Sequence, residues 1–343
     1  MDDFARQPEE ERRQYFDEAA ARRGLLPQII EKDFWVCWTL RRLFSLEEFR
    51  DHLTFKGGTT LSKVYGVIER FSEDVDVAIE REFLGFGGDE EPEKGGSGKE
   101  RERRLDRLRQ MCQTTIAERL QPQLRDAIAV AVGTLNDWSV SLDPDDPDQQ
   151  SLLFQYPPAI RDGLSPYFAP SVKVELGARS DHFPLERADV TPYVGEEFPD
   201  AFSDAQVPVR VLVAARTFWE KALILHQEHH GPEHRNLRPR LSRHYYDVYR
   251  LSQSPVLQEA LAKMDLLERV AIFKDVYFRA GWARYDEART GSLRLSPPDR
   301  IAAALKEDYR RMRPMFFTDP PPMDEILAHL PTLEAQINET KGA

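Results

Sequence analysis

Residues 54–80 of the chain read TFKGGTTLSKVYGVIERFSEDVDVAIE, and this stretch decides the fold. A β-type segment ends at Gly57 and Gly58, whose missing side chains let backbone N–H groups approach a ligand closely. Apolar residues then recur at i, i+3, i+4 and i+7, which predicts a helix from residue 59 to about residue 68. The N-terminus of such a helix, beside the two glycines, is a favourable place for a phosphate group.

Two acidic residues stand on the strand that is predicted next. Asp74 and Asp76 alternate with Val75, Val77 and Ile79, so both carboxylates lie on one face of the strand and the apolar residues on the other. Neighbouring carboxylates repel each other unless a cation lies between them, which makes the pair a natural site for Mg²⁺. A phosphate site beside paired carboxylates is the arrangement that phosphoryl or nucleotidyl transfer requires.

Neither motif is specific by itself. Asp-x-Asp occurs twice more, at Asp143/Asp145 and Asp146/Asp148, in a loop that contains prolines, and a Gly-Gly pair is usually an ordinary turn. The specificity comes from the order of the parts: a strand, the glycine pair, a helix, and then Ser-x-Asp-x-Asp on a strand.

The rest of the 343 residues predicts two domains. Strand-like runs recur at 137–142, 151–156, 171–177, 187–193 and 207–213, and helical patterns dominate from residue 217 onward. We therefore expect an α+β domain over residues 1–213, with N-terminal helices and an inserted helix at about 100–132. A helical domain is expected over residues 214–343.

Composition and charge restrict the classes of function. With 47 Lys and Arg against 59 Asp and Glu, the net charge is −12, which argues against a protein that coats nucleic acid or a membrane surface but leaves room for a local basic groove. Cys37 and Cys112 cannot form a disulfide framework, and the N-terminus lacks the features of a signal peptide. No apolar stretch approaches the ~18 residues of a membrane span. These features predict a cytoplasmic protein that does not associate with membranes.

Several motifs in the same order resemble the AbiEii/AbiGii toxin family. They are residues 56–76, VKVELGARS (172–180), RTFWEKALILH (216–226) and RLSRHYYDVYRL (240–251), and the resemblance runs from about residue 30 to 250. It implies a nucleotidyltransferase with a polymerase-β-like core, a mixed or antiparallel sheet and a C-terminal helical domain. Such proteins act as toxins of bacterial toxin–antitoxin or phage-abortive systems.

The resemblance also implies roles for individual residues. Asp74, Asp76 and Glu175 are expected to be metal ligands, with Glu175 at a position where polymerase-β-like enzymes more often carry aspartate. Lys221 is expected to reach the triphosphate, and Asp247 matches the family's downstream catalytic aspartate. The residues expected around the nucleotide are Lys56, Gly57, Gly58, Thr59, Lys63 and Ser72.

The implied substrates are an NTP and an acceptor, with Mg²⁺ or Mn²⁺ as the cofactor. Acceptors in the family include RNA, notably tRNA 3′ ends, and also proteins, and a cognate antitoxin is the implied partner. Two arginine-rich segments, 101–109 and 310–313, offer surfaces for an RNA backbone. The acids interspersed among these arginines are equally typical of a solvated helix.

Two other functions stay open from the sequence. Four histidines within nine residues suggest a zinc-dependent hydrolase, although their spacing matches neither His-Glu-x-x-His nor a closed four-ligand site. They are His226, His229, His230 and His234. The other alternative is a non-catalytic RNA- or protein-binding module on the same fold, against which the intact Asp74/Asp76 pair argues. The choice of NTP, the acceptor and the oligomeric state do not follow from the sequence.

Overall fold

The computed structural model describes residues 1–161 and 169–340, and the chain divides into two compact units. The first unit comprises Met1–Val64 and Phe71–Val211. The second comprises Tyr65–Arg70 and Leu212–Ala343. A single boundary after residue 213, as expected, would place Tyr65–Arg70 in the first unit. This short segment belongs to the second unit.

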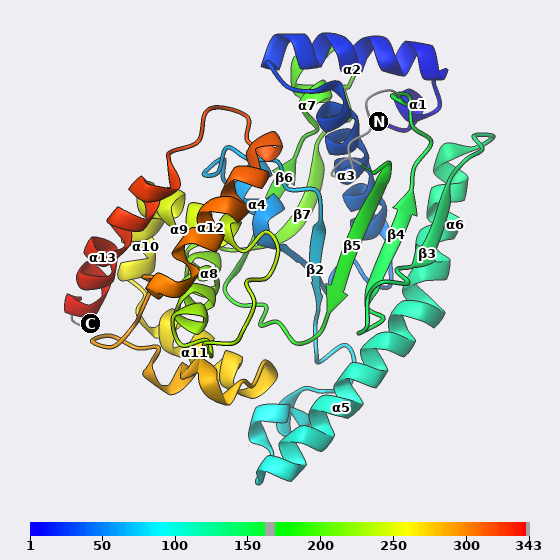
Figure 1. Ribbon diagram of the computed structural model, residues 1–343. Coiled ribbons are helices and arrows are strands. Elements are labelled where there is room, and N and C mark those ends of the chain that lie inside the picture. Colours follow the sequence, from blue (N-terminus) through cyan, green and yellow to red (C-terminus); the bar gives the residue numbers. More distant parts are fainter. Residues whose placement is uncertain (162–168, 341–343) are drawn as a thin grey trace. The chain divides into compact units, whose positions relative to one another are not determined.

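A mixed sheet lies at the centre of the first unit, and among the described residues it has seven strands in the order β3-β4-β5-β2-β1-β7-β6 (Figure 1). Strand β1 runs antiparallel to β2 and parallel to β7, and β2 runs parallel to β5. The strands are β1 (Leu53–Lys56), β2 (Val75–Ile79), β3 (Ser139–Leu142), β4 (Ser151–Gln155), β5 (Ser171–Gly177), β6 (Leu185–Val190) and β7 (Val207–Leu212). All the predicted strands are present, which confirms the α+β class with a mixed sheet; the strand expected at 187–193 begins two residues earlier.

The helices of the first unit include the predicted insertion. They are α1 (Asp2–Ala5), α2 (Glu9–Arg23), α3 (Pro27–Ser45), α4 (Gly57–Lys63), α5 (Gly98–Thr115), α6 (Gln121–Val132) and α7 (Tyr193–Glu197). The helix expected at about 100–132 is formed by α5 and α6, which one π-helical turn at Ile116–Leu120 joins. Over the described ranges, no helix combines the length and the apolar character needed to cross a membrane.

The helix α3 covers the apolar face of the sheet. It begins at Pro27, whose fixed φ suits the first position of a helix. The Trp38 ring stacks on Phe154 of β4 with ring centroids 5.7 Å apart, and the Trp35 ring stacks on Tyr156 just beyond that strand. Since Phe154 is the register partner of Val172 in β5, α3 lies on the face to which the buried valines of β5 point.

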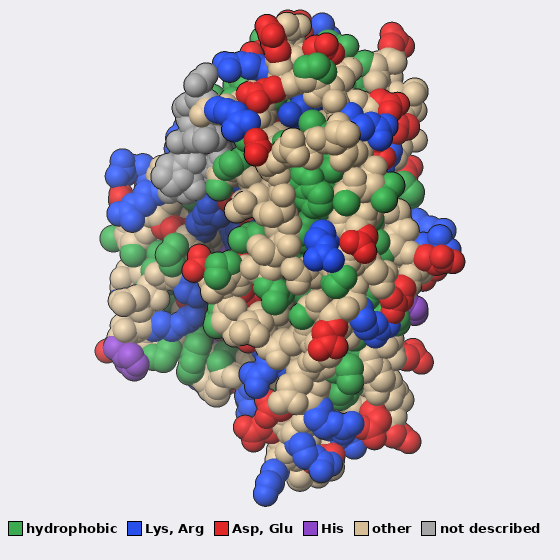
Figure 2. Space-filling model, turned by 90° about the vertical axis from the view of Figure 1, so that its right-hand side faces the viewer, with side chains coloured by type: hydrophobic (Ala, Val, Ile, Leu, Met, Phe, Trp, Pro, Cys, Tyr) green, Lys and Arg blue, Asp and Glu red, His purple; other side chains and the backbone are tan. Residues whose placement is uncertain are grey.

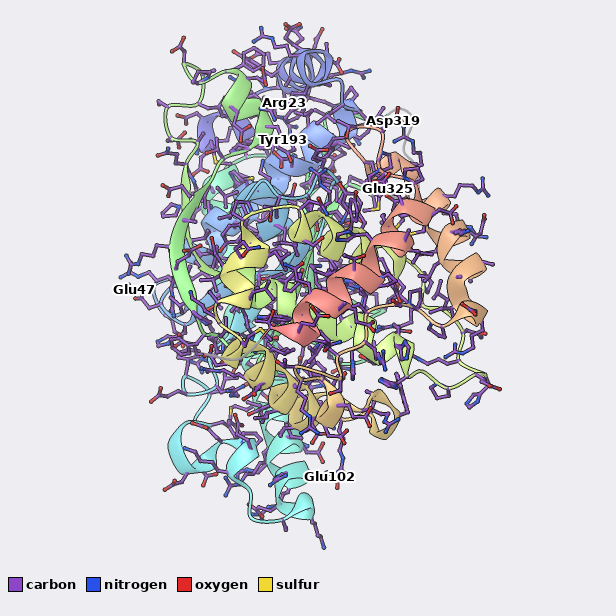
Figure 3. All side chains as sticks on the ribbon, turned by 90° about the vertical axis from the view of Figure 1, so that its left-hand side faces the viewer. Arg23, Glu47, Glu102, Tyr193, Asp319 and Glu325 are labelled. Atoms are coloured by element: carbon purple, nitrogen blue, oxygen red, sulfur yellow. The ribbon has the colours of Figure 1, made fainter. Side chains whose placement is uncertain are left out.

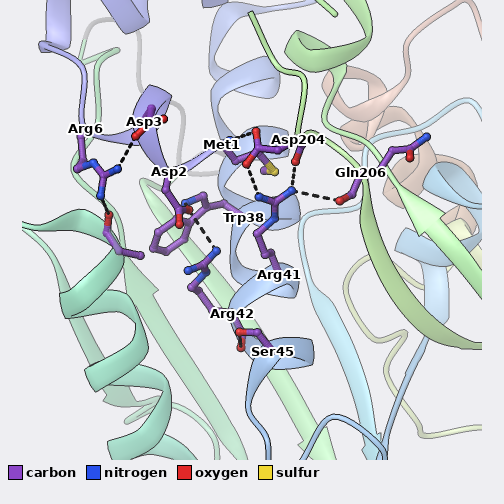
Figure 4. A network of polar contacts seen from close by, with 11 residues as sticks. Met1, Asp2, Asp3, Arg6, Trp38, Arg41, Arg42, Ser45, Asp204 and Gln206 are labelled. Atoms are coloured by element: carbon purple, nitrogen blue, oxygen red, sulfur yellow. Dashed lines mark hydrogen bonds and ion pairs between the residues drawn. The ribbon is translucent and has the colours of Figure 1, made fainter.

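The N-terminal residues are fastened to α3 by polar contacts (Figure 4). The ammonium group of Met1 and the guanidinium of Arg41 both contact the carboxylate of Asp204, the latter at 2.7 Å. The indole N–H of Trp38 donates to the carboxylate of Asp2 at 2.9 Å. These contacts hold α1 and the loop around Asp204 against the same helix that covers the sheet.

The helix after the glycine pair is shorter than predicted. It includes both glycines, covers Gly57–Lys63 and ends before Gly66, which has a φ of +61°. Tyr65 and Ile68, which suggested a longer helix, are in the segment that joins the second unit, where the Tyr65 hydroxyl donates to the carbonyl of Leu212 at 3.0 Å. The spacing of these apolar residues thus reflects burial in another unit and not a continuing helix.

The second unit is helical, as the patterns from residue 217 onward predict. Its helices are α8 (Ala214–His229), α9 (Ser242–Ser252), α10 (Val256–Leu261), α11 (Asp265–Tyr277), α12 (Asp299–Arg311) and α13 (Met323–Glu339). Helix α8 packs against α9, α10 and α11. Large side chains such as Trp219, Tyr245 and Tyr246 fill the interior and are at most 1% exposed.

Three consecutive charged residues on α3 are buried. Glu31, Lys32 and Asp33 are each at most 4% exposed. The carboxylate of Glu31 accepts hydrogen bonds from the backbone N–H groups of Ala159, at 2.6 Å, and Ile160, at 3.1 Å. This carboxylate therefore fixes the segment that follows β4, because buried backbone N–H groups need an acceptor.

A pH-dependent stability follows from the environment of Glu31. Burial raises the pKa of Glu31 to about 7, against the opposing effect of the two N–H donors and Arg12. Because the pKa in the folded state lies above the ordinary 4.5, this group makes the folded state less stable as the pH rises from about 4.5 to about 7. The Glu31→Gln variant should lack this loss, which amounts to about 3 kcal/mol in the free energy of unfolding. Chemical unfolding at pH 5 and pH 8 measures it, and parallel pH profiles of the two proteins would contradict the assignment.

Candidate active site

A row of polar residues crosses one face of the sheet. In the strand register, Asp76 of β2 is the partner of Glu175 in β5 and of Lys56 in β1. Glu175 is in turn the partner of Ser151 in β4. Residues of β5 alternate between buried and half-buried, so this row lies on the face opposite the one that α3 covers. The two acids expected from distant parts of the sequence therefore lie side by side.

Glu175 experiences repulsion from its neighbours. Partial burial and the negative charges of Asp76 and Asp74 raise the pKa of Glu175 to about 7. Lys173, two residues earlier on the same strand face, opposes this effect with its ammonium group 3.3 Å from Glu175 Oε1 and 3.0 Å from Asp143 Oδ2. Carboxylates that share a site in this way are stabilised by a bound cation.

The chemistry of these donors fits a hard divalent cation, since Mg²⁺ and Mn²⁺ prefer carboxylate oxygens. Their side chains do not converge on one point. Across residues 1–161 and 169–340, no three His, Cys, Asp or Glu side chains are grouped so as to hold an ion. Glu175 is engaged with Lys173, so binding of a cation by all three acids requires this side chain to change partner.

Gly57 lies against the carboxylate of Asp76. Its φ of +86° is in the region that favours glycine, and a Cβ atom at this position would lie 2.0 Å from Asp76 Oδ2. The first glycine is therefore required both by the backbone conformation and by the closeness of the acid. Gly58, the second glycine, is buried inside the first turn of α4.

Thr59 connects the glycine pair to the start of β2. Its hydroxyl donates to the backbone carbonyl of Asp74 at 2.6 Å and lies 3.3 Å from the carbonyl of Ser72. The Thr60 hydroxyl donates to the carbonyl of Gly57 at 2.8 Å. Thr59, which was expected to hold phosphate, thus uses its hydroxyl to fix the backbone of the acidic segment.

Lys63, also expected near the nucleotide, lies in the interior of the first unit. Its side chain is 4% exposed, and its ammonium group is 2.9 Å from Asp33 Oδ1 on α3. The same ammonium group lies 3.4 Å from the centroid of the Tyr193 ring on α7. The position of this charge indicates that Lys63 joins three helices.

Lys221 and Asp247 pair with each other in the second unit. The Lys221 ammonium group lies 2.7 Å from Asp247 Oδ2, and Arg70 donates to both carboxylate oxygens at 2.8 and 2.7 Å. The Asp247 side chain is 0% exposed. Burial alone would raise the pKa of Asp247, but the charges of Arg70 and Lys221 outweigh it and hold the pKa well below the ordinary value. Arg70, to which the sequence assigned no role, thus completes this cluster.

Most arginines of the two arginine-rich segments pair with nearby acids. On α5, Arg103 and Arg104 pair with Glu100, and Arg109 pairs with Asp106. Near the C-terminus, Arg310 and Arg311 both pair with Glu307, and Arg313 pairs with Asp319. Acidic and basic side chains also lie interspersed on the face drawn in Figure 2. These surfaces are therefore typical of solvated helices and give no special support to RNA binding.

Two residues of the histidine cluster use ring nitrogens for contacts with the backbone. His226 Nε2 contacts the carbonyl of Arg284 at 3.0 Å, and its Nδ1 accepts a hydrogen bond from the backbone N–H of Arg294 at 3.1 Å. His229 Nδ1 contacts the carbonyl of Ser296 at 2.7 Å. Because both nitrogens of His226 are taken by backbone groups, the structure argues against the zinc-dependent hydrolase.

Comparison with known proteins identifies the family to which the chain belongs. The family described as nucleotidyl transferase AbiEii toxin, type IV toxin–antitoxin system, matches residues 38–335. The chain belongs to this family. It is therefore a nucleotidyltransferase and a toxin of a type IV toxin–antitoxin system.

The fold of this AbiEii toxin is also found among solved structures. MenT4, the nucleotidyltransferase toxin Rv2826c from Mycobacterium tuberculosis H37Rv, matches with a TM-score of 0.50 over 95% of this chain and 90% of that chain. The two sequences are 16% identical, so the similarity concerns the fold. No curated protein sequence matches the chain.

The sequence reasoning missed the charged residues of α3. Glu31, Lys32 and Asp33 stand between the apolar pairs Ile29-Ile30 and Phe34-Trp35, in a helix that is buried on most sides. Charged residues in such a position almost always have partners. This pattern was therefore a visible signal, although the partners themselves lie elsewhere in the chain.

The contact between Gly57 and Asp76 can be tested by adding one methyl group. In Gly57→Ala the new Cβ must displace the Asp76 carboxylate, and we expect nucleotidyl transfer to fall by at least ~10²-fold, since small misplacements of reacting groups have effects of this size. Gly24→Ala is the matched control, because Gly24 also has a positive φ, +65°, but has open space around it. Label transfer from NTP at equal protein concentration measures both. Equal activity of the two variants would contradict the proposed constraint.

The buried cluster of the second unit predicts a large effect on stability. Asp247→Asn leaves Arg70 and Lys221 without their shared counter-charge, which should reduce the free energy of unfolding by about 3–5 kcal/mol. Glu307→Gln, which removes the partner of two exposed arginines, should change it little. Since the folded-state pKa of Asp247 lies below the ordinary 3.8, its contribution is present above about pH 4 and is lost as the pH falls. Denaturant titration at pH 7 tests this, and equal unfolding midpoints would refute it.

Proposed function

We propose that this AbiEii toxin transfers a nucleoside monophosphate from an NTP to an RNA acceptor in a reaction that depends on Mg²⁺ or Mn²⁺. The observation that carries the proposal is the pairing of Asp76 with Glu175 across β2 and β5, with Asp74 two residues earlier and Gly57 in contact with Asp76. In this proposal tRNA 3′ ends are the acceptor, as the family resemblance implies.

Asp74, Asp76 and Glu175 would hold the divalent ion. The raised pKa of Glu175 reflects the burial and repulsion that a cation would relieve. When bound, such an ion neutralises the triphosphate and activates the attacking hydroxyl. Lys173, which pairs with Glu175, is a cation on the same strand face, and its pairing with Asp143 would leave it a partner when Glu175 turns to the ion.

The glycine pair would accommodate the nucleotide. The lack of side chains at Gly57 and Gly58 lets the backbone approach the phosphates, and Lys56 and Ser72 supply polar groups at the ends of the adjoining segments. In the transfer, the acceptor hydroxyl releases its proton to solvent and its oxygen bonds to the α-phosphorus, while the bond from the α-phosphorus to the α–β bridging oxygen breaks and pyrophosphate leaves. Thr59 contributes by holding the carbonyl of Asp74, and thus the position of the acid pair.

Asp247 would act through Lys221, to which the family resemblance assigns a role toward the triphosphate. Both carboxylate oxygens of Asp247 are occupied by Arg70 and Lys221, which supports a positioning role and not a role as a metal ligand. The partner of the toxin would be a cognate antitoxin. Because the net charge is −12, the RNA acceptor would be bound only locally, at the active site. Its binding would weaken as the salt concentration increases.

The test is transfer of label from each NTP to total RNA in the presence of Mg²⁺ or Mn²⁺. We expect label in the tRNA fraction with the wild-type chain and a loss of at least ~10²-fold in Asp76→Asn, because the bound ion supplies several kcal/mol of transition-state stabilisation. Asp145→Asn is the matched control, since Asp145 is an exposed member of another Asp-x-Asp motif. This control should transfer label as the wild type does.

The other outcomes are distinct. Label in protein but not in RNA, lost in Asp76→Asn, would replace the RNA acceptor by a protein acceptor. Transfer that persists in EDTA would refute the metal dependence. An Asp76→Asn variant as active as the wild type would refute the assignment of the acid row.

A further inference from the structure

The chain leaves the first unit and returns to it within a few residues of the proposed site. It leaves after α4, which begins at Gly57, and returns shortly before β2, which carries Asp76. The intervening Tyr65–Arg70 belongs to the second unit, where the carbonyl of Glu69 accepts a hydrogen bond from the N–H of Phe317 at 3.0 Å. The two flanks of this segment must therefore be fixed within the first unit by other contacts.

Asp33 of α3 fixes the flank at which the chain leaves. Its carboxylate pairs with Lys63, the last residue of α4, at 2.9 Å and accepts the backbone N–H of Tyr193 at 2.6 Å. The ring of Tyr193 lies between two cations, with Lys63 Nζ 3.4 Å and Arg23 Cζ 4.7 Å from its centroid. Tyr193 and Arg23 lie close together in Figure 3. Since Lys63 and Asp33 are 4% and 2% exposed, this contact is shielded from water.

Lys32, the preceding residue on α3, fixes the flank at which the chain returns. Its ammonium group lies 2.6 Å from Glu73 Oε2, and the two side chains are 5% and 11% exposed. Glu73 thus reaches α3, the helix on the apolar face of the sheet. Asp76 lies in the polar row on the other face, as the alternation of a strand requires. The contact between Lys32 and Glu73 therefore determines the face of the sheet to which each residue of the acidic segment points.

We propose that Lys32 and Asp33 are positioning residues of the active site, which hold the glycine pair and the acidic strand in place from the far side of the sheet. The proposal rests on the proposed function, because it concerns the geometry of the same metal site. Asp33 acts through Lys63 on α4, and Lys32 acts through Glu73 on the segment before β2. Two adjacent residues of one rigid helix thereby fix the spacing between Gly57 and the acids.

General energetics favour this role over simple stabilisation. A buried ion pair contributes little net stability compared with apolar residues of similar size, because desolvation offsets the attraction. It does require both partners to stay in one arrangement. Groups hydrogen-bonded to metal ligands typically change the affinity for the metal by about 10–100-fold when they are removed, and the partner of Lys32, Glu73, is the direct chain neighbour of Asp74.

The experiment is Mn²⁺ binding, followed through the loss of the free-Mn²⁺ EPR signal, together with the melting temperature of each variant. Lys32→Met should weaken Mn²⁺ binding at least ~10-fold, and Lys32→Arg, which restores the charge, should bring it back to within ~3-fold of wild type. Glu31→Gln is the matched control, because Glu31 is equally buried on the same helix but fixes residues 159 and 160. It should bind Mn²⁺ as the wild type does.

The outcomes separate this proposal from the proposed function. If the wild type binds no Mn²⁺, the proposed function fails and this proposal fails with it. If the wild type binds Mn²⁺ and Lys32→Met binds it equally well, only the positioning role is overturned. A loss in Glu31→Gln as large as in Lys32→Met would also overturn it. If Lys32→Met does not fold, the exchange Lys32→Glu with Glu73→Lys decides: wild-type affinity supports the role, and affinity reduced tenfold or more in the folded protein overturns it.

Discussion

The mutual repulsion of Asp74, Asp76 and Glu175 is the constraint around which the first unit is built. The strand register brings Asp76 and Glu175 together, and burial together with the charges of Asp76 and Asp74 raises the pKa of Glu175. Other contacts keep the acids from moving apart. Thr59 holds the carbonyl of Asp74, and the buried charges of α3 hold the segments on either side. Much of the polar chemistry in this unit thus serves to maintain a geometry that its acids alone would resist.

Much of the fold could be predicted from the sequence because the signals were local. Alternation of apolar residues predicted β2, which begins one residue after Asp74, and proline and polar turns marked most of the other boundaries. The acids could be found for the same reason, since Asp74 and Asp76 lie in one strand and Glu175 in a strand with the same alternation. The helical spacing of apolar residues was misleading at Ile68. This residue is buried because it belongs to the second unit, and it does not lie in a continuation of α4.

The roles of individual charges could not be predicted, because they depend on partners far away in the chain. Lys63 pairs with Asp33, which precedes it by 30 residues, and Asp247 pairs with Arg70 across 177 residues. A lysine a few residues after a glycine pair, such as Lys63, suggests a phosphate ligand as long as its partner is not known. The same holds for the arginines of α5, three of which pair with Glu100 or Asp106.

The segment Tyr65–Arg70 makes the sheet of the first unit inseparable from the helices that follow it in sequence. Because Arg70 is 1% exposed and finds its carboxylate in α9, a fragment ending after β7 would leave this guanidinium without its counter-charge. Such a protein cannot be divided at a single linker, as many two-domain enzymes can. Recombination that exchanges one unit alone would separate Arg70 from Asp247, so the two units of this toxin should be inherited together.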